Sequence, residues 1–310
     1  MTPSGLQHWP PDTRVPVVTR FAPSPTGYLH LGHVVNAIYV WGMAHATGGT
    51  VIVRLEDHDR IRSRPEFASA IIDDLRWLGF VSNVDAVVRQ QDRNALYADA
   101  LERLLRVAHV YACDCSRTSF EGQRYPGRCR DRGLAETAGR SLRVQLEPGV
   151  EQASDLRLGL LQQTPTDQCG DLIVRDRDGH WTYQFAVTVD DLDQGVTVVV
   201  RGEDLLSSTG RQVQLGRWLQ RAGIGTGSWP PQYLHHALIF EENGAKLSKS
   251  TRATGVRHLR AEGVAAGEVI GRAAAAVHLI DAPRAIDASN VSELLVPPAL
   301  ARPVEPSPRP

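Results

Sequence analysis

Short apolar runs alternate with helical periodicity along the first third of the chain. The β-branched run at 15–22 (VPVVTRFA) predicts a buried strand, and the run at 50–55 (TVIVRL) predicts a second. Helical spacing is found at about 32–47, where a pair of glycines ends it, and again at 65–78 and 94–109. Strand, helix, strand, helix is the order of a parallel α/β sheet.

The pattern is less regular between residues 113 and 170, and we interpret this stretch as an insertion in the sheet. Apolar runs and helical spacing then return. They predict strands at 172–175, 182–189, 197–200 and 236–240, a helix at 207–222, and short helices up to about residue 280.

A turn that cannot be regular structure separates the first strand from the first helix. This turn, 23–27 (PSPTG), is followed by His30-Leu31-Gly32-His33. In parallel α/β sheets, ligands bind where a strand leads into a helix N-terminus, because the free N–H groups there favour anionic oxygens. Gly32 lets a flat group approach the backbone, and His30 and His33 can donate to phosphate oxygens. The other interpretation is a pair of capping or surface histidines.

Composition excludes several classes of protein. The chain has 310 residues with 42% hydrophobic and 22% charged residues, which is ordinary for a soluble globular protein. A net charge of −1 gives no global basic field, so contact with RNA requires local patches. The apolar stretch 264–280 is interrupted by charge, and residues 1–20 contain no apolar signal region. We therefore expect a cytoplasmic protein with no membrane partner.

Lysine is confined to one short segment. Of the 34 basic residues only Lys246 and Lys249 are lysines, in the segment Lys-Leu-Ser-Lys-Ser at 246–250. A lysine is a compact, mobile point charge, which suits a departing phosphate better than the planar fork of arginine. Two such charges on one loop fit the stabilisation of pyrophosphate as it leaves. The alternative is a solvated basic loop.

The chain has four cysteines, which are too few for a disulfide scaffold in a protein of this size. Three of them lie close together in the sequence. Cys113, Cys115 and Cys129 are soft ligands that suit a tetrahedral zinc ion, which needs a fourth ligand. Cys169 is one candidate. Three buried free cysteines are the alternative. Arginines 117, 124, 128, 130 and 132 surround the cluster, either as a phosphate-contacting face or as a solvated surface.

The two phosphate-handling segments together resemble a known family. HLGH at 30–33 and KLSKS at 246–250 are similar to the paired signatures of class I aminoacyl-tRNA synthetases, and RFAPSPTG at 20–27 resembles the glutamate-specific branch. The resemblance covers about residues 15–250. It implies ATP as substrate, with Mg²⁺ expected beside it. It also implies catalytic roles for His30, His33, Lys246 and Lys249, and ATP contacts from these four together with Gly32 and Ser248.

The same resemblance implies a binding site for glutamate. Its residues are Arg20, Phe21, Ala22, Pro23, Ser24, Glu56, Tyr183 and Arg201. An acid at the end of the second strand suits the substrate ammonium, and an arginine fork suits its side-chain carboxylate. Alternatively, Glu56 pairs with Arg54, and Tyr183 and Arg201 are structural.

The resemblance also implies a fold and a division of the chain. We expect an α/β protein of the class I synthetase type, with a Rossmann-like parallel sheet, an inserted zinc-binding subdomain and a short helical C-terminal region. The expected limits are 1–112 and 171–250 for the two halves of the catalytic domain, 113–170 for the acceptor-like insertion, 251–296 for the helices, and 297–310 for a disordered proline-rich tail. One structural zinc per chain is expected, held by Cys113, Cys115, Cys129 and, by the family pattern, Tyr125.

Only 60 residues follow Ser250, too few for an anticodon-binding domain of ordinary size. The chain therefore resembles a family of truncated paralogues, the glutamyl-Q tRNA(Asp) synthetases. This resemblance implies transfer of glutamate to queuosine in the anticodon of tRNA(Asp). Two alternatives remain: a truncated enzyme that charges the 3′ end of tRNA(Glu), and a nonacylating ATP- or RNA-binding paralogue. The oligomeric state is open, with a monomer expected.

Overall fold

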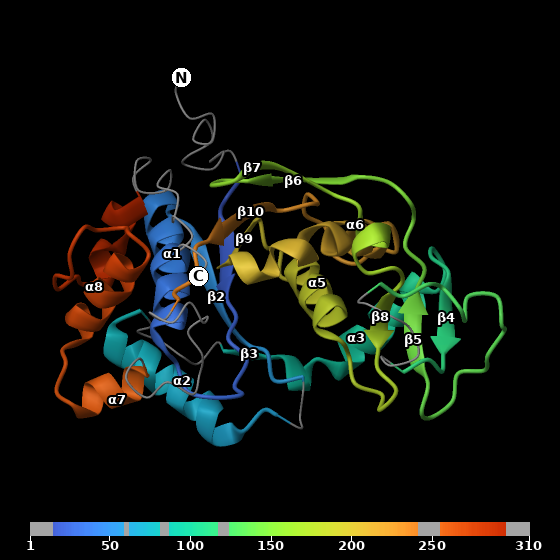
Figure 1. Ribbon diagram of the computed structural model, residues 1–310, viewed down its shortest axis with the longest axis horizontal. Coiled ribbons are helices and arrows are strands. Elements are labelled where there is room, and N and C mark those ends of the chain that lie inside the picture. Colours follow the sequence, from blue (N-terminus) through green and yellow to red (C-terminus); the bar gives the residue numbers. More distant parts are fainter. Residues whose placement is uncertain (1–14, 59–61, 81–86, 117–123, 241–254, 296–310) are drawn as a thin grey trace, which may run out of the picture.

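The computed structural model describes residues 15–58, 62–80, 87–116, 124–240 and 255–295. The first part of the chain forms a parallel sheet, as predicted. Strand β1 (Val18–Phe21) pairs with β2 (Thr50–Leu55), and β2 pairs with β3 (Val88–Arg89), all in parallel. Helix α1 (Leu31–Thr47) connects β1 to β2, and α2 (Pro65–Leu78) follows β2 (Figure 1). The predicted bounds of β2 and α2 are confirmed.

A second set of parallel strands continues beside β1. Strand β9 (Val198–Gly202) pairs in parallel with β10 (Gln232–His236), and β10 pairs in parallel with β6 (Glu151–Asp155). Strand β7 (Gly159–Gln163) completes the set as the antiparallel partner of β6. The backbone N–H of Thr197 donates to the carbonyl oxygen of Val18 at 2.9 Å, which places β9 next to β1.

Three antiparallel strands form a separate sheet at one end of the molecule, on the right of Figure 1. They are β4 (Val110–Cys113), β5 (Ser141–Val144) and β8 (Leu172–Arg175). The region expected to be irregular therefore contains strands β5, β6 and β7 and the short helix α4 (Pro165–Gln168). Pairing crosses both expected limits of the insertion. Strand β4 pairs with β5 across the first limit, and β6 pairs with β10 and β8 with β5 across the second.

Two predicted strands are wrong in type or position. The segment 182–189 is not a strand but the start of helix α5 (Tyr183–Asp193). Its β-branched residues suggested a strand, yet its buried side chains Phe185, Ala186, Val189 and Leu192 follow helical spacing. The strand expected at 236–240 is β10, which ends at His236. Helix α3 (Asn94–Leu104) also ends five residues earlier than predicted.

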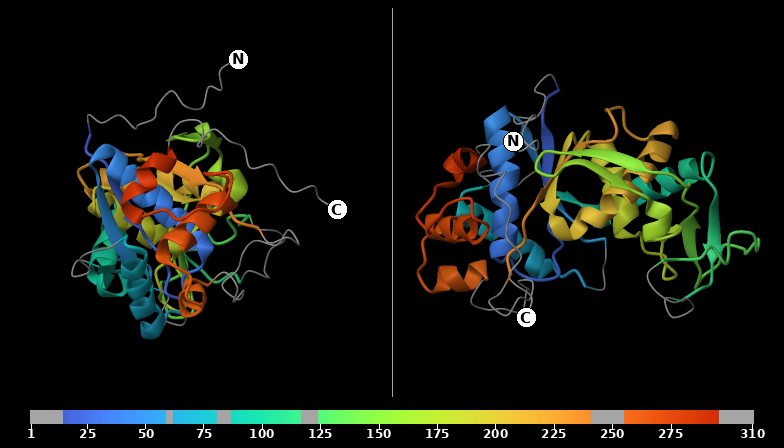
Figure 2. Two further views of the ribbon diagram at one scale, coloured as in Figure 1. Left: turned by 90° about the vertical axis from the view of Figure 1, so that its left-hand side faces the viewer. Right: turned by 45° about the horizontal axis from the view of Figure 1, so that its top comes forward.

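Short helices cover the outer side of α1, as predicted (Figure 2). These are α7 (Val256–Ala261), α8 (Ala266–Ala276) and the 3₁₀ segment η5 (Ala288–Leu295), all within the expected helical region 251–296. The segment η5 approaches α1 closely at Gly42, where an added Cβ would lie 2.7 Å from a methyl carbon of Leu295. Helix α6 (Thr209–Arg221), preceded by the 3₁₀ turn η3 (Glu203–Ser208), confirms the helix expected at 207–222.

Two of the expected segments, the loop 241–250 and the tail 297–310, lie outside the described residues. Among the helices that the structure describes, none is long and apolar enough to cross a bilayer.

Candidate active site

The carboxyl ends of the parallel strands open into one cavity of about 680 Å³. This is the position at which open parallel sheets bind ligands. The structure brings together around it all of the residues predicted to hold the amino acid, together with three of the residues predicted to contact ATP. These are Arg20, Phe21, Ala22, Pro23, Ser24, Glu56, Tyr183 and Arg201, and then His30, Gly32 and His33.

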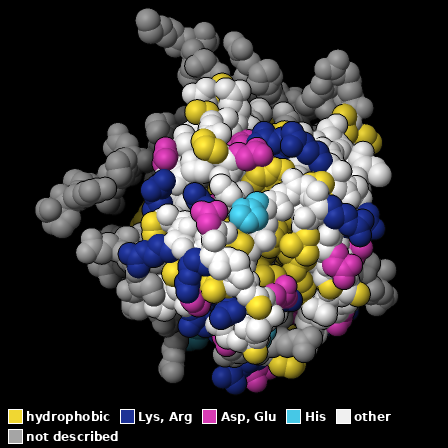
Figure 3. Space-filling model, turned by 90° about the vertical axis from the view of Figure 1, so that its right-hand side faces the viewer, with side chains coloured by type: hydrophobic (Ala, Val, Ile, Leu, Met, Phe, Trp, Pro, Cys, Tyr) yellow, Lys and Arg dark blue, Asp and Glu magenta, His cyan; other side chains and the backbone are white. Residues whose placement is uncertain are grey.

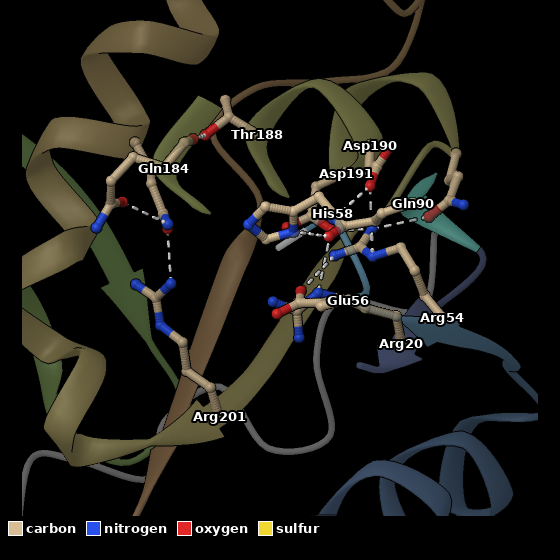
Figure 4. A network of polar contacts seen from close by, with 12 residues as sticks. Arg20, Arg54, Glu56, His58, Gln90, Gln184, Thr188, Asp190, Asp191 and Arg201 are labelled. Atoms are coloured by element: carbon tan, nitrogen blue, oxygen red, sulfur yellow. Dashed lines mark hydrogen bonds and ion pairs between the residues drawn. The ribbon is translucent and has the colours of Figure 1, made fainter. Parts of the chain in front are cut away.

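Arg20 and Arg54 share one buried carboxylate beneath the cavity (Figure 4). The Arg20 Nε donates to Asp191 Oδ1 at 3.1 Å, and its NH1 donates to the carbonyl oxygen of Val200 at 2.9 Å. Arg54, which is fully buried, donates from NH1 to the same Asp191 oxygen at 2.9 Å. Its Nε lies 3.7 Å from Asp190. Asp190 also pairs with Arg93, which has Asp193 as a second acid. The three aspartates of α5 therefore balance the charge of the three arginines.

Glu56 remains as an additional buried acid at the wall of this cavity. Its Oε1 is 3.6 Å from Arg54 NH2, longer than the contacts Arg54 makes with Asp191. Burial raises the pKa of Glu56 to about 7, because the loss of water outweighs the attraction of Arg54 and Arg20. Since Asp190 and Asp191 already balance Arg54 and Arg20, the carboxylate of Glu56 is suited to a cationic ligand group.

Arg201 is a buried cation held only by neutral groups. Its Nε donates to His235 Nε2 at 3.0 Å, NH1 to Gln212 Oε1 at 2.6 Å and NH2 to Thr209 Oγ1 at 2.8 Å. Its guanidinium carbon also lies 5.1 Å from the centre of the Tyr233 ring. Among the described residues no carboxylate forms an ion pair with Arg201, which stands apart from the Arg54 group in Figure 4. A buried arginine in this state favours an anionic ligand.

Tyr183 begins α5 at the cavity, and Gln184 follows it into a polar chain. Burial raises the pKa of Tyr183, so its hydroxyl stays protonated and can donate. The amide oxygen of Gln184 accepts from Gln212 at 2.8 Å, and its amide nitrogen donates to Ser208 at 2.8 Å. The chain Arg201–Gln212–Gln184 connects β9 to α5, which fixes Arg201 from the side of the helix (Figure 4).

His30 and His33 cap the N-terminus of α1. The Nδ1 of His30 accepts from the backbone N–H of Gly32 at 3.1 Å, and the Nδ1 of His33 accepts from the N–H of His30 at 3.1 Å. With Nδ1 as acceptor in both rings, the proton of each neutral ring sits on Nε2, which is a donor. The capping interpretation is confirmed. The same rings line the cavity, and their contact with phosphate oxygens stays a prediction.

Among the cavity-lining residues that were not predicted from the sequence, Asn36 and His236 are joined by a hydrogen bond. Asn36 lies one turn beyond His33 on α1, and its Nδ2 donates to His236 Nε2 at 3.1 Å. His236 ends β10 and stacks on Tyr39 with ring centres 5.3 Å apart. Burial lowers the pKa of His236 to about 4, so the ring is neutral. The sequence contained a signal for both residues. Asn36 lies on the same face of the predicted helix as His33, and His236 lies at the end of a strand.

The predicted nucleotide residues Lys246, Ser248 and Lys249 lie outside the described residues. The described residues on either side of this segment are at the cavity and at the start of α1. Ile239 lines the cavity, Gly255 forms a bridge with His30, and the N–H of Val256 donates to Leu29 O at 2.9 Å.

The cysteine cluster forms a second site, at the β4 end of the molecule. The Sγ atoms of Cys113, Cys115 and Cys129 lie within 4.8 Å of one another, with 3.6 Å between Cys115 and Cys129. The Tyr125 hydroxyl lies 3.5 Å from Cys113 Sγ. Although burial opposes it, hydrogen bonds from Tyr125 and Arg143 lower the pKa of Cys113 to about 7. Thiolates that share one zinc ion at about 2.3 Å stand about 3.8 Å apart, so the group can hold a metal ion.

Cys169 and the surrounding arginines have local partners. Cys169 Sγ lies 3.3 Å from the carbonyl oxygens of Pro165 and Gly170, and it is not part of the three-cysteine group. Arg130 pairs with Asp171 at 2.5 Å, and Arg132 pairs with Asp114 at 2.8 Å. Arginines (dark blue) and acids (magenta) are interspersed on this face (Figure 3), so the described arginines do not form a continuous basic patch.

Comparison with known proteins identifies the family. Residues 16–141 and 128–265 match the model of the tRNA synthetases class I (E and Q), catalytic domain. Glutamyl-Q tRNA(Asp) synthetase of Rhodobacter capsulatus is 40% identical over 281 residues, which covers 82% of this chain and 98% of that protein. The protein of the same name in Pseudomonas aeruginosa is 44% identical over 240 residues, covering 76% and 78%.

Solved structures agree on the fold. The glutamate-tRNA synthetase of Elizabethkingia anophelis matches with a TM-score of 0.65 and 27% identity, covering 80% of this chain and 54% of that one. A glutamate tRNA ligase of Elizabethkingia meningosepticum matches with a TM-score of 0.70 at 24% identity, covering 90% and 64%. The chain thus spans between about half and two thirds of the length of these larger proteins. The chain is a ligase that belongs to the class I tRNA synthetases (E and Q) and, within them, to the glutamyl-Q tRNA(Asp) synthetases.

Proposed function

We propose that this enzyme activates glutamate with ATP and transfers it to queuosine in the anticodon of tRNA(Asp). The observation that carries the choice of glutamate is the pair of opposite buried charges in one cavity. Among the described residues, Arg201 has neutral partners only, and Glu56 is an acid in excess of its arginines. Glutamate carries a side-chain carboxylate for the first and an α-ammonium group for the second.

The chemistry of activation is the attack of the α-carboxylate of glutamate on the α-phosphorus of ATP. The new bond joins a carboxylate oxygen to that phosphorus, and pyrophosphate leaves with the electrons of the broken P–O bond. His30 and His33 line the cavity at the N-terminus of α1, where Nε2–H groups and backbone N–H groups are suited to phosphate oxygens that gain charge. Lys246 and Lys249 supply the charge for pyrophosphate, and Mg²⁺ accompanies ATP.

Structural zinc is part of the same proposal. Cys113, Cys115 and Cys129 supply three thiolates. Tyr125 is the fourth ligand in this proposal, supported by its hydroxyl at 3.5 Å from Cys113 Sγ. Four protein ligands leave no position for substrate, so the role of the ion is to hold the strand ends and loops of this region together.

The acceptor is supported by the relatives. Proteins that are 40–44% identical to this chain over about three quarters of its length or more carry the name glutamyl-Q tRNA(Asp) synthetase. The residues of the cavity lie within the part of the chain, 16–265, that matches the catalytic domain of the family. Splayed bases of an RNA loop are accessible to such a cavity, unlike bases inside a helix.

The test is transfer of radiolabelled glutamate, with ATP, to purified tRNA(Asp) that either carries or lacks queuosine. Label on the queuosine form alone is the expected result. Label on tRNA(Glu) instead would assign charging of the 3′ end, and label on no tRNA, without glutamate-dependent ATP–pyrophosphate exchange, would contradict both activation and transfer. Glutamine in place of glutamate is the matched substrate control, because it lacks the carboxylate that Arg201 is proposed to bind.

A further inference from the structure

A chain of three buried groups leads from β6 to Arg201. Asp155 ends β6, His235 lies on β10, and Arg201 lies on β9, and the side chains of Asp155 and His235 are fully buried. Asp155 Oδ2 and His235 Nδ1 are 2.7 Å apart, and His235 Nε2 is 3.0 Å from Arg201 Nε. Neither Asp155 nor His235 lines the cavity. Among the described residues, Arg201 is the hydrogen-bond partner that connects these two side chains to the cavity.

The contacts determine which nitrogen of His235 carries the proton. Arg201 Nε is always a donor, so His235 Nε2 must accept, and the proton of the neutral ring lies on Nδ1 and donates to Asp155. Burial lowers the pKa of His235, which agrees with a neutral ring. Thr209 Oγ1, at 3.3 Å from the same Nε2, accepts from Arg201 NH2 and donates to the ring. His235 and Thr209 therefore hold one edge of the guanidinium.

Asp155 is fixed as an acceptor by the backbone. Its Oδ1 accepts from the N–H groups of Arg157 and Leu158 at 2.9 and 2.8 Å, and its Oδ2 also accepts from the N–H of His235 at 3.1 Å. Backbone donors cannot reverse their role, whereas an imidazole can move its proton. The imidazole of His235 is therefore the one contact of Asp155 that responds when the carboxylate is changed.

Within the described part of the chain, Arg201 keeps two hydrogen-bond donors for a ligand. A guanidinium has five N–H groups, and three of them are used by His235, Gln212 and Thr209. The two that remain are on the terminal nitrogens, where a carboxylate can accept both. Because Nε and both terminal nitrogens of Arg201 are hydrogen-bonded, the guanidinium group is held in one orientation.

We propose that Asp155 and His235 are positioning residues that fix Arg201 for the distal carboxylate of the amino-acid substrate. Asp155 sets the proton of His235, and His235 sets the direction of the guanidinium. This inference rests on the proposed activation of glutamate, because it assigns the ligand of Arg201. It connects the hairpin β6–β7, which lies in the stretch expected to be an insertion, to substrate selection.

The substitution Asp155→Asn tests the proton on His235. The side-chain amide that replaces the carboxylate would have an oxygen on one side and an NH2 group on the other. If the oxygen accepts from the backbone N–H groups of Arg157 and Leu158, the NH2 group faces His235. The His235 ring can then adapt only by moving its proton from Nδ1 to Nε2. Two donors, His235 Nε2–H and Arg201 Nε–H, would then face each other. The expected result in glutamate-dependent ATP–pyrophosphate exchange is a KM for glutamate at least tenfold higher, with the KM for ATP within about twofold of the unsubstituted enzyme.

A matched pair of substitutions at His235 tests the same step without changing charge. His235→Leu removes the acceptor for Arg201, whereas His235→Gln can place an amide oxygen near the position of Nε2. We expect His235→Leu to raise the KM for glutamate at least tenfold and His235→Gln to restore most of it. Asp171→Asn is the control for loss of a buried carboxylate in another sheet. It is expected to lower thermal stability and to leave the KM for glutamate unchanged.

The outcomes separate the inference from the proposed function. If the unsubstituted enzyme shows no glutamate-dependent exchange, the proposed function fails. If it is active and both Asp155→Asn and His235→Leu keep its KM for glutamate, the positioning role fails. An equal rise of the KM for ATP and for glutamate, or equal effects of His235→Leu and His235→Gln, would also overturn it. If Asp155→Asn does not fold, as circular dichroism would show, the His235 pair decides alone.

Discussion

Burial makes Glu56 a weak acid near neutral pH. Its carboxyl group is 6% exposed, and the pKa rises to about 7 although Arg54 and Arg20 lie beside it. The other charged groups that face it are Asp190 and Asp191 on α5, which add to the rise. A substrate ammonium group requires the ionised form of Glu56. Binding of the substrate ammonium group should therefore weaken below about pH 7, whereas an ordinary glutamate would stay ionised down to about pH 4.5.

We predict that kcat/KM for glutamate in pyrophosphate exchange falls as the pH is lowered through about 7. The raised pKa also affects stability, because between pH 4.5 and 7 the folded protein binds a proton at Glu56 that the unfolded chain does not bind. The contribution of Glu56 to the free energy of unfolding is therefore fully present below its ordinary pKa and is lost as the pH rises through about 7. Glu56→Gln should thus abolish exchange yet raise the free energy of unfolding at pH 8, by an amount on the order of 2–3 kcal/mol. Denaturant titration and exchange assays at several pH values measure both.

Two results would contradict this prediction: a fall of kcat/KM only near pH 4.5, or a Glu56→Gln variant that is less stable than the unsubstituted enzyme at pH 8. Either would show that Glu56 forms a stabilising ion pair with Arg54. The sequence alone could not decide between these roles. It predicted that Arg20, Glu56 and Arg201 share a site, and the cavity brings them together. Whether Glu56 is needed to balance the charge of Arg54 depends on Asp191. That residue is 137 positions away from Arg54 in the sequence and belongs to no recognisable motif.

Helix α5 is the element that determines the charge of the site. It was predicted as a strand over 182–189, because valine and threonine are common in strands, but burial on its Phe185 and Val189 face stabilises the helix instead. The helix places Asp190 and Asp191 at successive positions. Asp190 accepts from Gln90, Arg93 and Tyr97, and Asp191 accepts from Arg20 and Arg54. Strands β1 and β2 were predicted with the correct type because their apolar runs are buried in a parallel sheet.

We predict that Asp191→Asn destabilises the fold by about 3–5 kcal/mol, because it leaves Arg20 and Arg54 buried without their shared carboxylate. Urea unfolding followed by tryptophan fluorescence measures this. Asp193→Asn, two residues along the same helix, is the control. Its side chain is 41% exposed, so the loss of its contact with Arg93 should change stability by less than about 1 kcal/mol. Equal effects of the two substitutions would contradict the role assigned to Asp191.

At the scale of the whole molecule, the cysteine cluster and the cavity belong to different parts of the fold. The buried residues of α1, β2 and the C-terminal helices form one core, and those of α3, β5, α5 and α6 form another. Cys113, Cys129, Tyr111 and Tyr125 form a small separate group. The sequence predicted this cluster from spacing, but its separation from the cavity follows from strand pairing between distant segments.

This separation predicts how the enzyme responds to loss of metal. The purified protein should contain about one zinc per chain, and a chelator should remove it. Amide hydrogen exchange should then accelerate in β4, which ends at Cys113, and in β5 and β8 of the same sheet, while β1, β2 and β9 keep their protection. Glutamate-dependent pyrophosphate exchange should fall by no more than about twofold, because no residue of the cluster lines the cavity.

The fourth ligand can be assigned in the same experiment with two matched substitutions. Tyr125→Phe removes the hydroxyl that lies 3.5 Å from Cys113 Sγ and should weaken zinc binding at least tenfold. Cys169→Ser removes a thiol that contacts local carbonyl oxygens and should leave the metal content unchanged. The reverse pattern would assign Cys169 as the ligand, and a protein purified without zinc would remove the site. A loss of protection spread evenly over all three sheets would instead mean that the metal holds the whole catalytic unit together, because the two cores would then unfold as one.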